Sequence, residues 1–189
     1  MNRFLILTAL VASACATTDG SARQPRPLAP TGDSPIAFGA LGAKYEVPQR
    51  LRITDHDKKP GMVWFDFIDN NNGCVGAVVF YASSDRNRPM SYVSSATETD
   101  KQDFQTKGID LSLAPASHQP MLGEKALVQV ANLSTKTDKA AKAHFGVFVP
   151  EQQLAVVGNV FCDDPGFIEP QLQVISQVVN SQQQERAGR

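Results

Sequence analysis

Hydrophobic and polar side chains alternate most regularly between residues 62 and 81, and this alternation predicts a β-hairpin. Val63, Phe65 and Phe67 alternate with other residues and would share one face of a strand. The turn sequence Asn-Asn-Asn-Gly follows, and a second apolar run begins at Cys74. Because Asn-Gly supplies the positive φ angles that a tight reversal needs, we expect the two runs to pair as antiparallel neighbours.

A second hairpin is predicted between residues 143 and 162. Phe145, Val147 and Val149 would share one face of its first strand. The sequence Pro-Glu-Gln-Gln then turns the chain, and a long apolar run returns. This pair of strands is also expected to be antiparallel.

Weaker patterns add further elements. One more strand is predicted at 126–133, and one or two within 44–53. The segment around 99–107 is expected to form a short helix. Together with the hairpins, these segments predict a mainly antiparallel sheet of about six or seven strands.

The hydrophobic period changes after Pro165. Leu172, Ile175 and Val179 recur at helical spacing, while the glutamines fall mostly on the other side. We expect an amphipathic helix that begins at Pro170, where a missing N–H costs nothing, and that packs on the sheet. The predicted fold class is therefore α+β. In architecture alone, this order of elements resembles small envelope folds such as that of the photosystem oxygen-evolving extrinsic proteins.

The first fifteen residues have the order of an export signal. Arg3 is followed by an apolar run from Phe4 to Val11 and then by small residues up to Cys15. The run is far shorter than the ~20 residues that a transmembrane helix needs, so residues 1–14 are predicted to be a removable signal peptide. Ordinary signal peptidase also accepts such small residues before its cut, which leaves a second cleavage route open.

The segment Val11-Ala12-Ser13-Ala14-Cys15 resembles the lipobox of bacterial lipoproteins, with Ala12 where Leu is usual. The resemblance covers the signal region alone. It implies that Cys15 receives diacylglycerol on its sulfur before cleavage. Ala16, in place of Asp after the cysteine, implies export to the outer membrane of a Gram-negative cell. A stable anchor needs more than one acyl chain, which mature bacterial lipoproteins carry.

The composition after Cys15 is that of a tether. Residues 15–35 contain four prolines and hardly any bulky apolar side chain. Such a segment cannot bury enough surface to offset the entropy of ordering it, and prolines favour extended conformations. We therefore expect a lipidated flexible linker at 15–35, a single globular α+β domain at 36–184 and a disordered tail at 185–189.

Cys74 and Cys162 remain once Cys15 is assigned to the lipid. An even pair in an exported protein is most simply a disulfide, and each cysteine lies at the end of a predicted strand in a different hairpin. The bond would close a loop across 88 positions. Two separate buried thiols are the alternative.

The sequence contains no assembled catalytic or metal motif. His56, His118 and His144 do not lie at metal-ligand spacing, and the Asn-rich turn does not fit the EF-hand pattern. His56 lies in an apparent exposed turn at 55–61, and His144 is expected to face solvent. We assign no catalytic residue, metal ligand or cofactor, and we predict that the protein is not an enzyme. An enzyme would need a pocket that unites two or more of Asp55, His56, Asp66, His144 and Asp163.

The charge balance argues against a nucleic-acid partner. The chain has 18 Lys and Arg against 19 Asp and Glu, a net charge of −1, which gives no surface for neutralising phosphates. We predict a lipoprotein on the periplasmic side of the outer membrane, or alternatively a soluble periplasmic or secreted protein. Its non-enzymatic domain would bind or scaffold another envelope protein.

The second face of the predicted sheet supplies a possible contact surface. Trp64, Phe148 and Phe161 are its aromatic members. The main alternative function is that of a periplasmic inhibitor or immunity protein, which would need a protruding loop at 83–89 or 115–120. An envelope enzyme is the third hypothesis.

Overall fold

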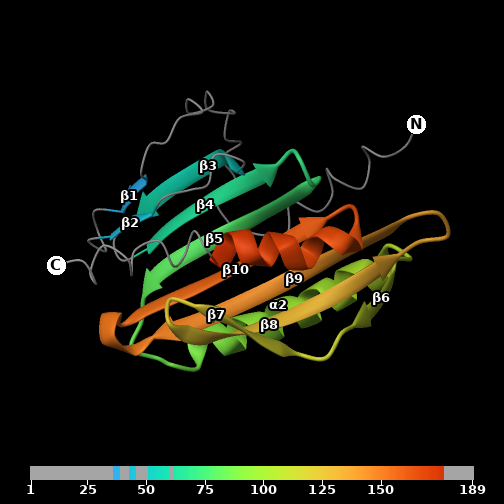
Figure 1. The fold of residues 1–189 in the computed structure, drawn as a ribbon. Helices are drawn as coiled ribbons and strands as arrows, with labels where there is room; N and C mark the ends of the chain where they lie inside the picture. Colours follow the sequence, from blue (N-terminus) through green and yellow to red (C-terminus); the bar gives the residue numbers. More distant parts are fainter. Residues whose placement is uncertain (1–35, 39–42, 46–50, 60–61, 177–189) are drawn as a thin grey trace.

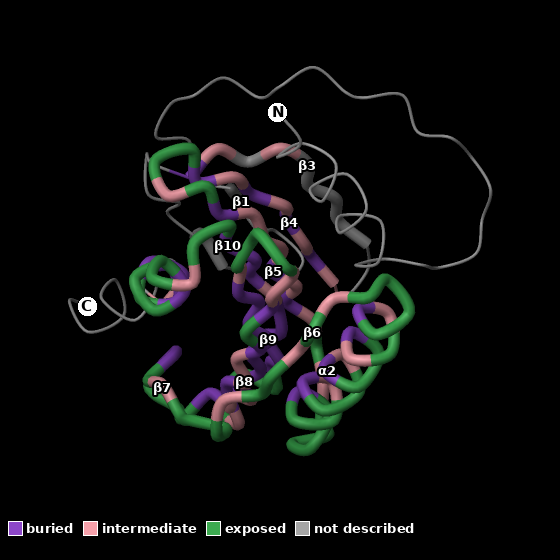
Figure 2. The backbone as a smooth tube through the Cα atoms, turned by 90° about the vertical axis from the view of Figure 1, so that its right-hand side faces the viewer, coloured by how far each residue is buried: buried purple, intermediate pink, exposed green. Residues whose placement is uncertain are grey.

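A computed structural model of the protein describes residues 36–38, 43–45, 51–59 and 62–176. Its main body is an eight-stranded sheet with one helix on each face (Figures 1 and 2). The predicted α+β class, antiparallel sheet and C-terminal helix are confirmed. The predictions for the signal peptide, for Cys15, for the linker and for the tail lie outside the described residues.

All strand pairs of the sheet are antiparallel, in the order β3-β4-β5-β10-β9-β8-β6, with β7 also paired to β8. The strands are β3 (Leu51–Lys59), β4 (Met62–Asp69), β5 (Cys74–Ala82), β6 (Asp110–Leu113), β7 (Ser117–Met121), β8 (Glu124–Ser134), β9 (Lys139–Val149) and β10 (Leu154–Cys162). A separate two-stranded sheet consists of β1 (Ile36–Phe38) and β2 (Ala43–Tyr45). Both predicted hairpins are therefore present, as β4–β5 and β9–β10.

The sequence prediction missed short or polar strands. β6 and β7 have little apolar alternation, and the segment predicted as a turn at 55–61 instead continues β3 as far as Lys59. The backbone of β3 from Asp55 to Lys59 pairs with β4 after a register shift that follows Ile53. Pairing to a strongly hydrophobic neighbour has overridden the polar composition of this segment.

The reversal between β4 and β5 is a four-residue loop. The Asn72 N–H donates to the Asp69 carbonyl at 3.3 Å, and the Asn71 N–H donates to the Asp69 side chain at 3.0 Å. In this loop Gly73 alone has a positive φ, +63°, so the expected tight turn with positive φ at both Asn and Gly is wrong. Glycine is suited to that one left-handed position.

One face of the sheet carries the large apolar core. Phe65, Phe80 and Phe145 are at most 1% exposed on this face, and the Phe65 and Phe80 rings stack with centroids 6.2 Å apart. The C-terminal helix, residues 168–176, supplies Leu172 and Ile175 to the same core. This helix begins two residues before the predicted Pro170, directly after a 3₁₀ turn at Pro165–Phe167.

Helix α2 (Arg88–Thr106) packs on the opposite face of the sheet (Figure 2). Its buried side turns towards β8, β9 and β10, and consists of Pro89, Val93, Thr97, Asp100 and Phe104. The prediction of a short helix at 99–107 was therefore wrong in extent, because α2 begins eleven residues earlier than expected. A stripe with one Thr and one Asp gives a weak hydrophobic period, which explains the error. Among the described residues, no helix is both long and apolar enough to cross a membrane.

Candidate functional site

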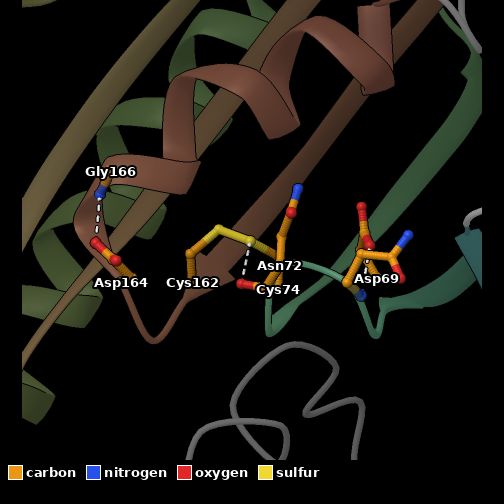
Figure 3. Close-up of a disulfide and its surroundings, with 7 residues drawn as sticks. Asp69, Asn72, Cys74, Cys162, Asp164 and Gly166 are labelled. Atoms are coloured by element: carbon orange, nitrogen blue, oxygen red, sulfur yellow. Dashed lines mark hydrogen bonds between the residues drawn. A yellow bond between two sulfur atoms is a disulfide. The ribbon is translucent and has the colours of Figure 1, made fainter.

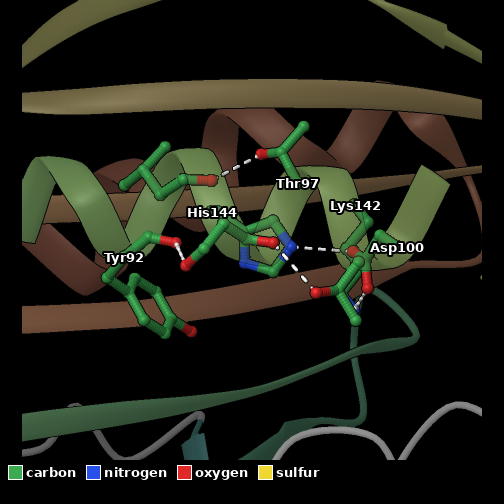
Figure 4. Close-up of polar contacts among 8 residues, drawn as sticks. Tyr92, Thr97, Asp100, Lys142 and His144 are labelled. Atoms are coloured by element: carbon green, nitrogen blue, oxygen red, sulfur yellow. Dashed lines mark hydrogen bonds and ion pairs between the residues drawn. The ribbon is translucent and has the colours of Figure 1, made fainter. Parts of the chain in front are cut away.

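The interface between α2 and β9 contains a cluster of three charged or polar side chains, drawn in Figure 4. Asp100 of α2 accepts hydrogen bonds from the Lys142 Nζ at 2.8 Å and from the His144 Nε2 at 2.7 Å. Lys142 and His144 alternate along β9 with Ala143 and Phe145, which face the opposite core. The strand's two-residue period thus brings both nitrogen donors to the carboxylate from the same side.

All three side chains are buried. Asp100, Lys142 and His144 are 6%, 7% and 5% exposed. Burial alone would raise the pKa of Asp100, but the hydrogen bonds and charges of His144 and Lys142 outweigh it and hold that pKa below its ordinary value. The cluster is therefore a buried carboxylate shared by two donors.

The surroundings of His144 orient its ring. Tyr92 meets the imidazole edge-on, with centroids 6.0 Å apart. Since the Asp100 carboxylate can only accept, the His144 Nε2 carries the proton between them, and the buried Nδ1 atom has no hydrogen-bond partner among the residues that the structure describes. Lys142 also lies 5.9 Å from the centre of the Phe104 ring.

An oriented imidazole is one component of acid–base catalysis, but catalysis also needs access for a substrate. The cluster lies beneath α2 with each member less than a tenth exposed. We interpret it as the polar attachment of α2 to the sheet, because the buried stripe of α2 offers only Val93 and Phe104 as large apolar groups besides Pro89. In the described part of the chain, no group of three or more His, Cys, Asp or Glu could hold a metal ion.

Among the residues that we consider for an enzyme, Asp55 and Asp66 are register partners on β3 and β4, whereas His144 and Asp163 lie apart from them. Asp66 and His144 lie in one row across the sheet, with β5 and β10 between them. Asp163 follows β10 and lies beside Gly73, at the end of the sheet. Asp55 and His56 lie on the edge strand β3, and their side chains are outside the described set. The expectation that His144 faces solvent was wrong, because α2 covers its side of β9.

One of the three residues of the predicted contact surface, Phe161, is buried, and the use of the other two in a contact stays a prediction. Phe161 is 4% exposed and packs against Phe104, so it belongs to the core beneath α2 and not to a surface. Trp64 and Phe148 are half-buried. Because α2 covers β8 to β10, the same face of β4 and β5 is left half-exposed. Its members are Met62, Trp64, Asp66, Ile68, Val75, Ala77, Val79 and Tyr81.

The two predicted loops are not free projections. Residues 83–87 are a short connection to α2, where the Ser83 N–H donates to the Gln153 carbonyl at 2.8 Å. Most of the segment 115–120 belongs to β7, which pairs with β8. Neither segment has the form that an inserting inhibitory loop requires. A small, partly open pocket of about 30 Å³ lies at the C-terminal end of α2, beside Phe104 and Phe161.

Cys74 and Cys162 form the predicted disulfide (Figure 3). The two residues are register partners at the ends of β5 and β10, and both are fully buried. The bond joins the two hairpins across 88 positions, so the prediction is confirmed and the alternative of two separate thiols is not what the structure shows.

Asp100 and Lys142 had not been singled out from the sequence. For Lys142 the sequence offers one signal. It lies with His144 on the face of the β9 strand opposite a strongly apolar face, and a strand can be buried on both faces when another element covers the second one.

Comparison with known proteins gives little further information. No family model matches the sequence, and no curated protein is detectably similar. Among solved structures, LpqN of Mycobacterium tuberculosis, involved in cell envelope biogenesis, is 14% identical over 73% of this chain and 79% of its own, with a TM-score of 0.40. A protein of unknown function from Pseudomonas aeruginosa, PA94, is 10% identical over 72% and 90%, with a TM-score of 0.35. Likeness of this extent does not indicate a shared activity.

Proposed function

We propose that this protein is a bacterial envelope lipoprotein whose non-enzymatic domain is held on the periplasmic side of the outer membrane and binds another envelope protein. Residues 1–14 would be the signal peptide, Cys15 the lipid attachment site, and the proline-rich segment up to residue 35 the tether. The observation that carries the proposal is the distribution of the three cysteines. Two of them pair in a buried disulfide, which leaves Cys15 with no intramolecular cysteine partner.

The disulfide supports export. Such bonds persist in oxidising compartments and are rare in the bacterial cytoplasm. Cys15 itself follows a charged start, an apolar run and three small residues, the order of a lipoprotein signal. Cys15, the remaining cysteine, would then be free to receive the lipid at the proposed cleavage position.

The half-exposed face of β4 and β5 supports the binding role. An apolar strand face with Trp64 and Tyr81 at partial exposure is the composition of a protein contact, since aromatic residues are enriched at interface centres. Arg88 lies 5.0 Å over the Tyr81 ring, which adds a further residue type common in interfaces.

Lipid attachment is tested by expressing the full chain in cells fed labelled palmitate. We expect label on the wild-type protein and its recovery in the outer-membrane fraction, and we expect a Cys15→Ala variant to lose both. Ala16→Asp is the matched control, which should stay labelled but move to the inner membrane. An unlabelled wild-type protein with a processed N-terminus would contradict the proposal and favour ordinary secretion.

The contact face is tested by a detergent-solubilised pull-down of the intact lipoprotein. We expect Trp64→Arg to lose a specific co-purifying envelope protein that Met90→Arg retains. Met90 is an exposed apolar residue on α2, 44% accessible, and so controls for the introduced charge. Equal recovery from both variants, with folding verified by circular dichroism, would exclude this face as the binding site.

A further inference from the structure

The loop between β4 and β5 contains the dipeptide Asn72-Gly73, in which the backbone N–H of Gly73 is available to react. Gly73 is exposed and has a φ of +63°. Among the described residues, none accepts a hydrogen bond from the Gly73 N–H, although the amides of Asn71 and Asn72 are both bonded to Asp69. The nitrogen of Gly73 is therefore an amide of the turn to which the described residues offer no acceptor.

The side chain of Asn72 is also unrestrained. It is half-buried, and in Figure 3 it projects away from the disulfide. The amide oxygen of Asn can accept hydrogen bonds and its NH₂ group can donate two. In Asn72, neither group is bonded to another described residue. The neighbouring glycine has no side chain to block an approach to the Asn72 side-chain carbon.

We propose that Asn72 is a site of spontaneous deamidation and isoaspartate formation. The Gly73 nitrogen attacks the Asn72 Cγ and gives its proton to solvent. A new C–N bond closes a five-membered succinimide, and the Cγ–Nδ2 bond breaks with loss of ammonia. Water then opens the ring at either carbonyl, which leaves aspartate or isoaspartate at position 72. The net reaction consumes one water and releases one ammonia, with no oxidation or reduction.

The modification would change the turn in two ways. A carboxylate at position 72 adds negative charge to a loop that already contains the buried Asp69, and Asp163 lies only 3.6 Å from where a Cβ on Gly73 would stand. A further carboxylate beside these acidic residues is unfavourable, because like charges that lie close together repel. Isoaspartate also lengthens the backbone by one methylene two residues before Cys74, whose disulfide fixes the end of β5. The turn would loosen while the disulfide keeps β5 and β10 together.

The test uses the folded, disulfide-bonded protein, incubated at mildly alkaline pH and digested without reduction. Mass spectrometry should show replacement of –NH₂ by –OH at Asn72, with two chromatographically distinct products. We expect the rate at Asn72 to be at least about tenfold above that at Asn87, Asn132 or Asn159, whose following residues carry side chains. A purified isoaspartyl methyltransferase with labelled methyl donor should label the aged protein.

Asn72→Gln should abolish this signal, because its longer side chain would have to close a six-membered ring. Asn71→Gln is the matched control, since it alters the same loop and keeps Asn72-Gly73 intact. Deamidation of Asn72 in the reduced, unfolded chain but no faster than Asn87 in the folded protein would overturn the proposal, because it would show that the fold protects the site. Methyl labelling that persists in Asn72→Gln on the peptide that spans position 72 would overturn it as well.

Discussion

The Asp100 Oδ2 and the His144 Nε2 lie 2.7 Å apart, although the two residues are 44 positions apart in the sequence. This contact, together with the 2.8 Å bond from Lys142, is the polar part of the attachment between α2 and the sheet. A buried carboxylate with two donors is costly to desolvate, and removing it leaves its partners buried without a counter-charge. The attachment of α2 should therefore depend strongly on this one side chain.

We expect Asp100→Asn to lower the free energy of unfolding by about 3 kcal/mol, because the neutral amide leaves the buried Lys142 ammonium without its carboxylate. Urea denaturation measures the change. Glu98→Gln is the control on the exposed side of α2, where Glu98 pairs with Lys101 at 3.8 Å and should contribute less than about 1 kcal/mol. A double variant with Lys142→Met should recover part of the loss. Equal stability of wild type and Asp100→Asn would show that the cluster does not hold α2.

The pH dependence of unfolding has a defined sign. The pKa of Asp100 is lowered in the folded protein from its ordinary 3.8, so the stability that it contributes is fully present above that value. This contribution is lost as the pH falls through the lower folded-state pKa. We expect the stability difference between wild type and Asp100→Asn to shrink as the pH falls from about 5 to about 2, when measured by denaturation at each pH. A difference that stays constant or grows in acid would contradict the assignment.

Loss of the disulfide should destabilise the domain without changing its strand order. In the chain-entropy account, a loop of 88 residues contributes about 4 to 5 kcal/mol, an upper value because residual structure in the unfolded chain reduces it. We expect a Cys74→Ala/Cys162→Ala variant to unfold at lower urea concentration, and the wild type to migrate faster on a non-reducing gel than after reduction. Identical mobility would mean that the bond is absent in solution.

Gly146→Ala should displace the start of α2. A Cβ at this position of β9 would stand 2.5 Å from the backbone oxygen of Pro89, and neither backbone can yield easily. We expect a cost of about 1 to 3 kcal/mol and faster hydrogen exchange in the first turns of α2. Gly108→Ala is the comparison: its φ is +68°, so it adds backbone strain, but it meets nothing within 4 Å. Its effect should leave exchange near Pro89 unchanged.

Local patterns sufficed for the parts of the fold that depend on strict alternation or pairing rules. The period-two runs around Phe65 and Phe145 predicted both hairpins, and the two cysteines at strand ends predicted the disulfide. These features succeed because a strand with one apolar face has only one way to bury it.

The candidate site depends on contacts that no local pattern contains. Alternation along β9 places Lys142 and His144 on the face opposite Phe145, but it does not tell which element covers that face. The covering helix α2 was underestimated because its buried stripe includes Thr97 and Asp100. Asp100 on α2 can be recognised as the partner of Lys142 and His144 only when the tertiary arrangement brings the helix and the strand together.

The place of β10 in the sheet has a consequence for how the chain is built. β10 lies between β5 and β9, yet in the described part of the chain it is the last strand along the sequence. Before β10 is synthesised, β3–β5 and β6–β9 are two half-sheets with unpaired inner edges. Cys162, the disulfide partner of Cys74, is also still absent. Assembly of the full sheet must therefore wait for the strand nearest the carboxyl-terminal end of the domain, so the two half-sheets stay unjoined for most of the synthesis of the chain.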